Sequence, residues 1–256
     1  MFNLENKKII ITGASKGLGL VCAKELAQKG ARLVLMARSY DLLEEVRKSC
    51  QNPDTHLSVE VDFLGKPDKI AEAIEKATTF LGEIDAVLHV AGGGYGLRDP
   101  FITSEDLEKL LAVNLKGAVE INRLVLPGMI HRKKGNLVHV GSITSSEAVA
   151  SVGYNTVKAA LAAYVRSIGK EVAKSGVIAT GILPGAFYAP GNSWERLEKN
   201  KPEVVKTFIE ERVPRGFLGK AEEMLPIILL LCSDSASMMS GCLVPIDAGE
   251  GKSYIT

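Results

Sequence analysis

The stretch ITGASKGLG, residues 11–19, decides the fold, because three glycines fall between an apolar run and a helical pattern. The run KKIIIT (7–12) leads into it, and LGLVCAKELAQKG (18–30) reads as the helix that follows. In a strand–turn–helix unit, glycine permits a tight turn and lets the backbone approach a bound pyrophosphate at the helix N-terminus. The glycines are spaced G-x-x-x-G-x-G, and their place in such a unit predicts a nucleotide-binding turn.

The same alternation of apolar runs and helical patterns continues to the end of the chain. Further strand-like runs cover residues 32–37, 57–62, 86–92, 136–142, 176–183 and 242–247. Strands separated by helices imply right-handed crossovers and a parallel sheet that is covered on both faces. The sequence shows neither an internal repeat nor a linker, so the pattern predicts a single α/β domain over residues 1–256.

Composition narrows the class of protein. Of the 256 residues, 46% are hydrophobic and 24% are charged, which is typical of a soluble globular protein. The 31 basic and 30 acidic side chains nearly cancel, so neither nucleic acid nor an anionic membrane is expected as a partner. The four cysteines and four histidines are dispersed, which argues against a disulfide framework and against a metal site. With no secretory pattern and no apolar segment of membrane-spanning length, we expect a cytoplasmic protein.

Residues 186–219 interrupt the alternation. The segment follows the carboxyl end of a predicted strand and contains Trp194, the only tryptophan. In open α/β sheets, ligands bind at the carboxyl ends of the strands. We therefore interpret the segment as a substrate lid, with a plain helical excursion as the alternative.

The end of the second predicted strand bears on the choice of nucleotide. It reads Met36-Ala37-Arg38-Ser39, without the acidic residue that would bind the ribose 2′-hydroxyl of NAD. The guanidinium of Arg38 can instead pair with a 2′-phosphate, which Lys16 can reach from the other side. Both residues could also be solvated surface cations. We predict NADP(H) as the cofactor.

A second set of motifs carries the chemistry. The segment YNTVK (154–158) places a tyrosine and a lysine four residues apart, on one face of a helix. Ser142 precedes the tyrosine by twelve residues, Asn114 lies in AVNLKG, and Pro184-Gly185 follows a predicted strand. Together with the glycine turn, these motifs in this order resemble the short-chain dehydrogenase/reductase family, and the resemblance covers essentially the whole chain.

The resemblance implies a Rossmann-type, doubly wound parallel sheet of about seven strands with helices on both faces. It also implies an oxidoreductase that interconverts a ketone and a secondary alcohol, as a homodimer or homotetramer packed through helices near 103–132 and 153–174. The catalytic residues that it implies are Asn114, Ser142, Tyr154 and Lys158. The cofactor contacts that it implies are Gly13, Ser15, Lys16, Gly17, Leu18, Gly19, Arg38, Ser39, Asp62, Phe63, Ala91, Gly92, Tyr154, Lys158, Pro184, Gly185 and Phe187.

The chemistry that these residues can perform follows from their side chains. A ketone that accepts a hydride develops alkoxide character and needs a proton, which Tyr154 can donate. The ammonium of Lys158 and an oxidised nicotinamide ring are expected to lower the pKa of that phenol. Ser142 can donate a hydrogen bond to the substrate oxygen, and the resemblance implies that Asn114 holds a water beside the lysine. Taken singly, each of these residues also has a purely structural interpretation.

Two stretches depart from the family pattern. His89-Val90-Ala91-Gly92 stands where the family usually has NNAG, so His89 either supports the neighbouring backbone or packs in the core. After Pro-Gly, Ala189 stands where the family often has a threonine that binds the nicotinamide amide. Backbone groups, Asn192 or Ser193 are then expected to bind that amide.

The substrate stays open between two classes. One is a 3-oxoacyl group on a carrier, for which the basic run 131–134 offers a docking surface, although cations at a helix C-terminus also complement the helix dipole. The other is a sugar, polyol or nucleotide-sugar, which the polar loop GGGYGLRDP (92–100) would suit. A catalytically idle NADP-binding sensor is a hypothesis of another kind, disfavoured because the serine, tyrosine and lysine are all present.

Overall fold

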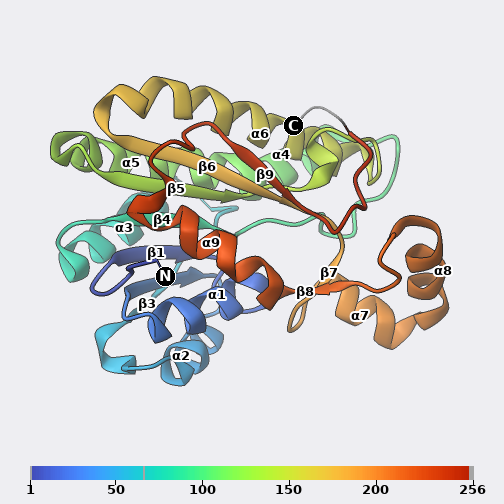
Figure 1. The fold of residues 1–256 in the computed structure, drawn as a ribbon, viewed down its shortest axis with the longest axis horizontal. Helices are drawn as coiled ribbons and strands as arrows, with labels where there is room; N and C mark the ends of the chain where they lie inside the picture. The colour runs from blue at the N-terminus through green and yellow to red at the C-terminus, as the bar shows by residue number, and fades with distance from the viewer. Residues whose placement is uncertain (1, 66, 254–256) are drawn as a thin grey trace.

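The β-branched runs form a seven-stranded sheet in the computed structural model, which describes residues 2–65 and 67–253 (Figure 1). The strand order is β3-β2-β1-β4-β5-β6-β9, and every neighbouring pair is parallel. The strands are β1 (Lys8–Thr12), β2 (Arg32–Ala37), β3 (Leu57–Glu60), β4 (Ala86–His89), β5 (Gly135–Val140), β6 (Val177–Pro184) and β9 (Leu243–Ile246). The prediction of about seven parallel strands is confirmed.

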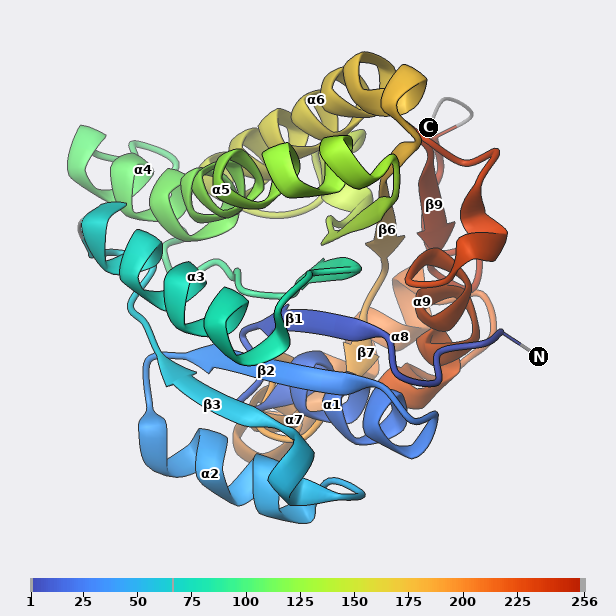
Figure 2. The same cartoon turned by 90° about the vertical axis from the view of Figure 1, so that its left-hand side faces the viewer.

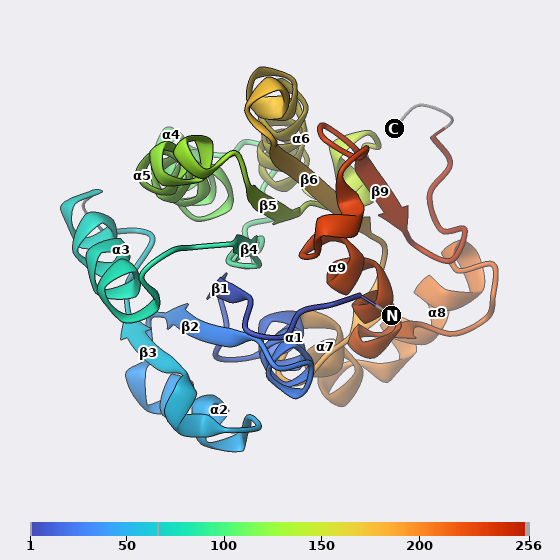
Figure 3. The same ribbon diagram turned by 60° about the vertical axis from the view of Figure 1, so that its left-hand side comes forward.

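Helices cover both faces of this sheet (Figures 2 and 3). One face carries α1 (Gly17–Gln28), α2 (Tyr40–Ser49) and α9 (Leu225–Leu231). The other carries α3 (Pro67–Leu81), α4 (Ser104–Leu111), α5 (Gly117–Arg132) and α6 (Val152–Val172). Short helical turns are η1 (Pro53–Thr55), η2 (Ala112–Lys116), η3 (Ile143–Ser145), η4 (Ala173–Ser175), η5 (Ala221–Met224) and η6 (Asp234–Ala236). Within the part of the chain that the structure describes, no helix combines the length and apolarity that a membrane span requires.

The strands bury both of their faces, which is why they read as continuous apolar runs. In β1, Ile9 and Ile11 belong to the core cluster beneath α1, α2 and α9, whereas Ile10 belongs to the cluster beneath α3 and α5. The chain moves outward from β1 in one direction through β2 and β3, and β4 then begins the other half. This reversal next to β1 creates the switch point at which open α/β sheets bind ligands.

The segment after β6 forms a helical hairpin at one side of the molecule (Figure 1). Its two ends are joined, because β7 (Phe187–Tyr188) pairs in parallel with β8 (Gly219–Lys220). Between them lie α7 (Ser193–Asn200) and α8 (Pro202–Arg212). The hairpin has a small core of its own, in which the rings of Trp194 and Phe208 lie 4.4 Å apart.

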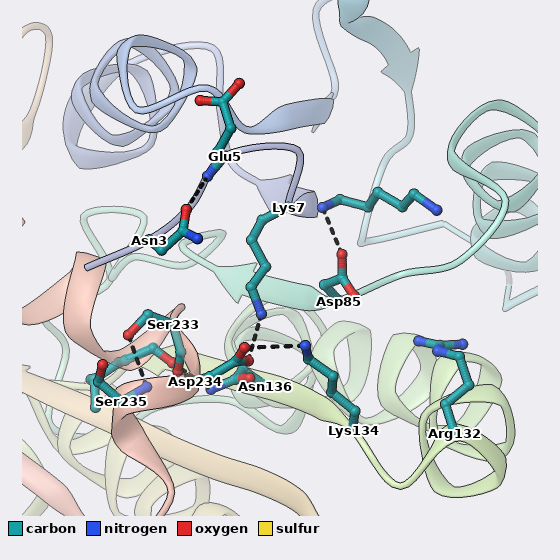
Figure 4. Close-up of polar contacts among 12 residues, drawn as sticks. Asn3, Glu5, Lys7, Asp85, Arg132, Lys134, Asn136, Ser233, Asp234 and Ser235 are labelled. Atoms are coloured by element: carbon teal, nitrogen blue, oxygen red, sulfur yellow. Dashed lines mark hydrogen bonds and ion pairs between the residues drawn. The ribbon is translucent and has the colours of Figure 1, made fainter. Parts of the chain in front are cut away.

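The amino ends of the strands meet at a polar surface on the opposite edge (Figure 4). Lys7 Nζ lies 2.5 Å from Asp234 Oδ1, and Lys134 Nζ lies 3.1 Å from the other oxygen of the same carboxylate. Asp85 accepts a hydrogen bond from the backbone N–H at the start of β1. The amide of Asn136 donates to two carbonyls near the end of α9. These contacts tie the two ends of the chain to the middle of the sheet.

Candidate active site

Most of the sequence-predicted site residues lie at one end of the sheet, because they follow the carboxyl ends of six neighbouring strands. The glycine turn follows β1, residues 38–39 follow β2, and residues 62–63 follow β3. Residues 91–92 follow β4, and Ser142 follows β5. The pair 184–185 marks the end of β6. The topology thus brings together positions as far apart in the chain as Gly13 and Gly185.

The glycines of the turn have separate physical roles. A Cβ atom on Gly19 would lie 2.2 Å from Gly13 O, and one on Gly13 would lie 2.8 Å from Ala91 N, so both are needed for close packing. Gly17 has a left-handed φ of +61°, and a Cβ atom there would meet open space. The N-cap residue Lys16 makes no side-chain cap, and Gly17 N–H is bound by the carbonyl of Pro190, so the N–H groups that follow Gly17 are the ones that face a possible anion. The side chain of Leu18 is buried, so only its backbone faces the turn.

Two polar side chains hold the loop that follows β4. Thr12 Oγ1 accepts hydrogen bonds from the backbone N–H groups of Val90 and Ala91, both at 3.1 Å. Asn114 accepts from the N–H of Gly93 and donates to its carbonyl, both at 3.0 Å. Sequence reasoning missed Thr12, although a hydroxyl at the end of an otherwise apolar strand was a usable signal.

Asn114 is placed by a local irregularity of its helix. It lies in η2, a π-helical segment between α4 and α5, and π-segments are frequent at functional sites. A Cβ atom on Gly92 would lie 2.8 Å from Asn114 Oδ1 and 3.4 Å from Lys158 Nζ. The asparagine and the lysine therefore approach each other across a position that only glycine can fill.

Tyr154, Lys158 and Ser142 meet where the start of α6 passes the carboxyl end of β5. The Nζ atom of Lys158 donates to Val140 O at 2.9 Å and lies 5.6 Å from the centre of the Tyr154 ring. Ser142 lies near enough to the phenol of Tyr154 to lower its pKa. Lys158 is only 3% exposed, and no carboxylate of residues 2–65 or 67–253 forms a salt bridge with it.

Burial controls the ionisation of this group. It raises the pKa of Tyr154 to about 12, and Ser142 only partly offsets this effect. Burial also lowers the pKa of Lys158 to about 8. The net shift of the phenol's pKa is therefore upward, because desolvation of the phenolate is its largest cause. The lowering expected from Lys158 and an oxidised nicotinamide ring stays a prediction.

His89 packs in the core and does not support the neighbouring backbone. It is paired with His139 across β4 and β5, and the two rings stack with centroids 4.7 Å apart. His89 Nε2 donates to Asn122 Oδ1 at 2.8 Å, and the Asn122 amide donates to His139 Nε2 and Tyr164 Oη at 3.1 and 3.0 Å. Burial lowers the pKa of both imidazoles. Of the two interpretations of His89, the packed core residue is correct.

Some of the other expected positions have different surroundings. Phe63 is buried against Gly117, and Asp62 accepts a hydrogen bond from the N–H of Leu64 while staying exposed. Asn192 is committed to the hairpin, because its side chain caps α7 and donates to Phe187 O at 2.7 Å. It is thus not free to replace the missing threonine.

The cations beside the glycine turn lack acidic partners. Among residues 2–65 and 67–253, neither Lys16 nor Arg38 has a salt bridge, and both are exposed. The guanidinium carbon of Arg38 lies over the ring of Tyr95, 5.8 Å from its centre. The hairpin also reaches the turn, since Gly17 N donates to Pro190 O at 2.8 Å.

The basic run at the end of α5 lies away from this edge. Arg132 donates to Ile84 O, and Lys134 pairs with Asp234 at the amino ends of the strands (Figure 4). The carrier-docking role of this run stays a prediction. The alternative, cations that complement a helix C-terminus, fits the structure.

A turn that suits a dinucleotide, beside a tyrosine, lysine and serine, defines a nicotinamide-dependent oxidoreductase of the Rossmann type. The family model for short chain dehydrogenases matches residues 7–200, and the chain belongs to this family. It is 29% identical to a 3-oxoacyl-[acyl-carrier-protein] reductase of Thermotoga maritima, over 96% of this chain and 98% of that protein. It is thus a dehydrogenase/reductase that acts on CH–OH and C=O groups.

In the described residues, no cluster of side chains could hold a metal ion.

Two solved structures are also similar. The L-sorbose reductase from Gluconobacter frateurii, complexed with NADPH and L-sorbose, has a TM-score of 0.88 and 26% identity, covering 99% of this chain and all of that chain. A 3-oxoacyl (acyl-carrier-protein) reductase from Agrobacterium tumefaciens C58 with NADP bound has a TM-score of 0.86 and 25% identity, covering 97% and 95%. These proteins share the fold and belong to different substrate classes.

Proposed function

We propose that this protein is an NADP(H)-dependent oxidoreductase that interconverts a ketone and a secondary alcohol, with Tyr154 as the proton donor and acceptor. The observation that carries the proposal is the group formed by the buried Ser142 and Lys158 and the half-buried Tyr154, at the carboxyl ends of the strands beside the glycine turn. When bound, the nicotinamide ring supplies or accepts the hydride.

Four side chains then have separate roles in the reaction. At neutral pH the phenol of Tyr154 holds its proton, because its pKa is about 12, and it can donate that proton to the carbonyl oxygen during reduction. Ser142 donates a hydrogen bond to the same oxygen as charge develops there. Lys158, with a pKa of about 8, is largely an ammonium at neutral pH and binds the ribose hydroxyls of the cofactor. Asn114 positions the loop after β4 and holds a water next to the lysine.

Arg38 supports NADP(H) as the cofactor rather than NAD. Its N–H groups have no salt-bridge partner among the described residues, and Lys16 lies on the glycine turn after the neighbouring strand β1. An unneutralised guanidinium at the end of β2 suits a 2′-phosphate, with which it can form two parallel hydrogen bonds. Two neighbouring structures were solved with NADPH or NADP, which agrees with this assignment.

A 3-oxoacyl group is the first substrate class to test, because the Thermotoga relative and the Agrobacterium structure are both named as reductases of such groups. A sugar or polyol is the second, supported by the structure with L-sorbose. We assign residues 186–219 to a substrate lid of a single domain, because the hairpin is joined at its base by β7 and β8. A cytoplasmic homo-oligomer, either a dimer or a homotetramer, completes the proposal.

Steady-state turnover of a panel of ketones with NADPH tests the reaction. The panel should include 3-oxoacyl thioesters and ketoses. Tyr154→Phe should lower kcat/KM by about 10²- to 10⁴-fold, because it removes the proton donor and keeps the ring. An unchanged rate would show that the tyrosine is not the acid. NADPH binding without turnover of any substrate would favour the catalytically idle sensor.

The cofactor assignment has its own test. Arg38→Asp should shift the preference from NADP towards NAD, because it removes the cation and adds a group that suits a ribose 2′-hydroxyl. Lys48→Asp, the same change of charge at an exposed position of α2, should leave the preference unaltered. A ratio of kcat/KM values for NADPH and NADH that Arg38→Asp does not change would exclude the 2′-phosphate site.

A further inference from the structure

The loop after β4 contains a backbone conformation that its sequence does not favour. Tyr95 has a left-handed φ of +53°. The loop around it contains Gly93, Gly94 and Gly96, and a glycine at position 95 would adopt this conformation without strain. A bulky side chain in this region is uncommon, and strained residues of this kind cluster at ligand sites. Tyr95 is 45% exposed, so burial in the core does not account for its conformation.

The position of the ring supplies a reason. Strands β2 and β4 flank β1, so Arg38 and Tyr95 come from the two sides of the glycine turn. Their side chains meet with the guanidinium carbon 5.8 Å from the ring centre, within the range of a cation–π contact. The preceding residue reaches the catalytic group, since a Cβ atom on Gly94 would lie 3.7 Å from the ring of Tyr154. The loop therefore connects the reacting end of the cleft with its cationic end.

We propose that Tyr95 determines cofactor specificity by holding Arg38 against its ring face, which leaves the N–H edge of the guanidinium for the 2′-phosphate of NADP(H). A guanidinium is planar, so its face can contact an aromatic ring while its edge binds a phosphate. This inference rests on the proposed function. The ligand class is an adenosine that carries a 2′-phosphate, and Tyr95 is a positioning residue that acts through Arg38.

Nucleotide binding tests the inference without any knowledge of the substrate. Isothermal titration calorimetry gives the dissociation constants of adenosine 5′-monophosphate and of adenosine 2′,5′-bisphosphate. The first constant divided by the second measures the preference for the 2′-phosphate. Tyr95→Leu should lower this ratio by about two- to five-fold, the range for an exposed cation–π contact, and leave binding of the monophosphate unaltered. Tyr95→Phe, which keeps the ring, should keep the ratio.

Two further variants separate specificity from folding. Tyr95→Gly removes the strain together with the ring, so it should lower the ratio while the melting temperature stays the same or rises. Phe217→Leu removes a similar exposed contact, in which Arg215 lies 4.4 Å from a ring centre, and should change neither ligand's affinity.

The results separate the role of Tyr95 from the NADP(H) assignment on which it rests. Equal binding of the two nucleotides by the unmodified protein would overturn the NADP(H) assignment and this inference with it. A clear preference that survives Tyr95→Leu would overturn the inference alone. An equal loss for both nucleotides would do the same, since the ring would then contact the nucleoside and not act through Arg38.

Discussion

A buried lysine lies at each end of the sheet, and the two lysines differ in whether a carboxylate neutralises their charge. At the amino end, Lys7 is 9% exposed and pairs with the carboxylate of Asp234 (Figure 4). At the carboxyl end, Lys158 is 3% exposed and donates to a carbonyl, without a salt bridge to any described residue. A buried charge that is left unpaired is costly, and such groups gather where a ligand completes the site.

The contrast extends to the neighbouring groups. At the amino end, Asn136 and Asp85 have their hydrogen-bond partners within the chain. At the carboxyl end, the helix α1 has no side-chain cap, and burial raises the pKa of Tyr154 while lowering that of Lys158. The amino end is built for stability and the carboxyl end for binding. Each prediction below tests one side of this difference.

The largest effect is expected for Lys158→Met. It removes the cation and keeps an unbranched side chain, so kcat/KM for ketone reduction should fall by about 10²- to 10⁴-fold. The free energy of unfolding should not decrease, because an unpaired buried ammonium is replaced by an apolar group. Lys170→Met, at an exposed position of the same helix, is the matched control and should change neither quantity. A marked loss of stability without loss of turnover would show that Lys158 serves stability and not catalysis.

Acid should weaken the carboxyl end through His139. Its pKa is about 4 in the folded protein and about 6.5 in an unfolded chain, so the folded state keeps the imidazole neutral. The stability that this gives is complete above pH 6.5 and is lost as the pH falls towards 4. For a pKa shift of this size, the free energy of unfolding should fall by roughly 3 kcal/mol.

Urea unfolding at pH 7 and pH 4.5 measures this loss. The difference between the two pH values should be smaller for His139→Gln than for the unmodified protein. His131→Gln, at an exposed position, should behave like the unmodified protein. The assignment would be wrong if all three proteins lost the same free energy.

Much of this arrangement could be predicted from the sequence, for physical reasons. The strands and the glycine turn have local signals, and parallel topology then brings the ends of β1 to β6 together. The neighbours of His89 could not be predicted, because the stack with His139 depends on the register of β4 against β5. The net upward shift of the pKa of Tyr154 could not be predicted either, since sequence spacing shows a nearby cation but not how deeply the phenol is buried.

The titration of Lys158 gives a kinetic prediction. Its pKa of about 8 means that the ammonium is lost as the pH rises above that value. The kcat/KM for ketone reduction should therefore fall about tenfold for each pH unit above 8. Lys158→Arg, which keeps its charge in this range, should be slower at neutral pH and show no such decline. A flat profile to pH 9.5 for the unmodified protein would contradict the role of the ammonium.

The smallest effect is expected at the amino end, from Asp234→Asn. The change leaves the buried ammonium of Lys7 without its carboxylate, and the free energy of unfolding should fall by about 1 kcal/mol, since the carboxylate is 59% exposed and screened by solvent. Lys134→Met removes the more exposed of the two ion pairs and should cost less. Both variants should keep the kcat/KM of the unmodified protein. A kinetic defect in Asp234→Asn would show that the two ends are coupled, because no catalytic side chain lies at this edge.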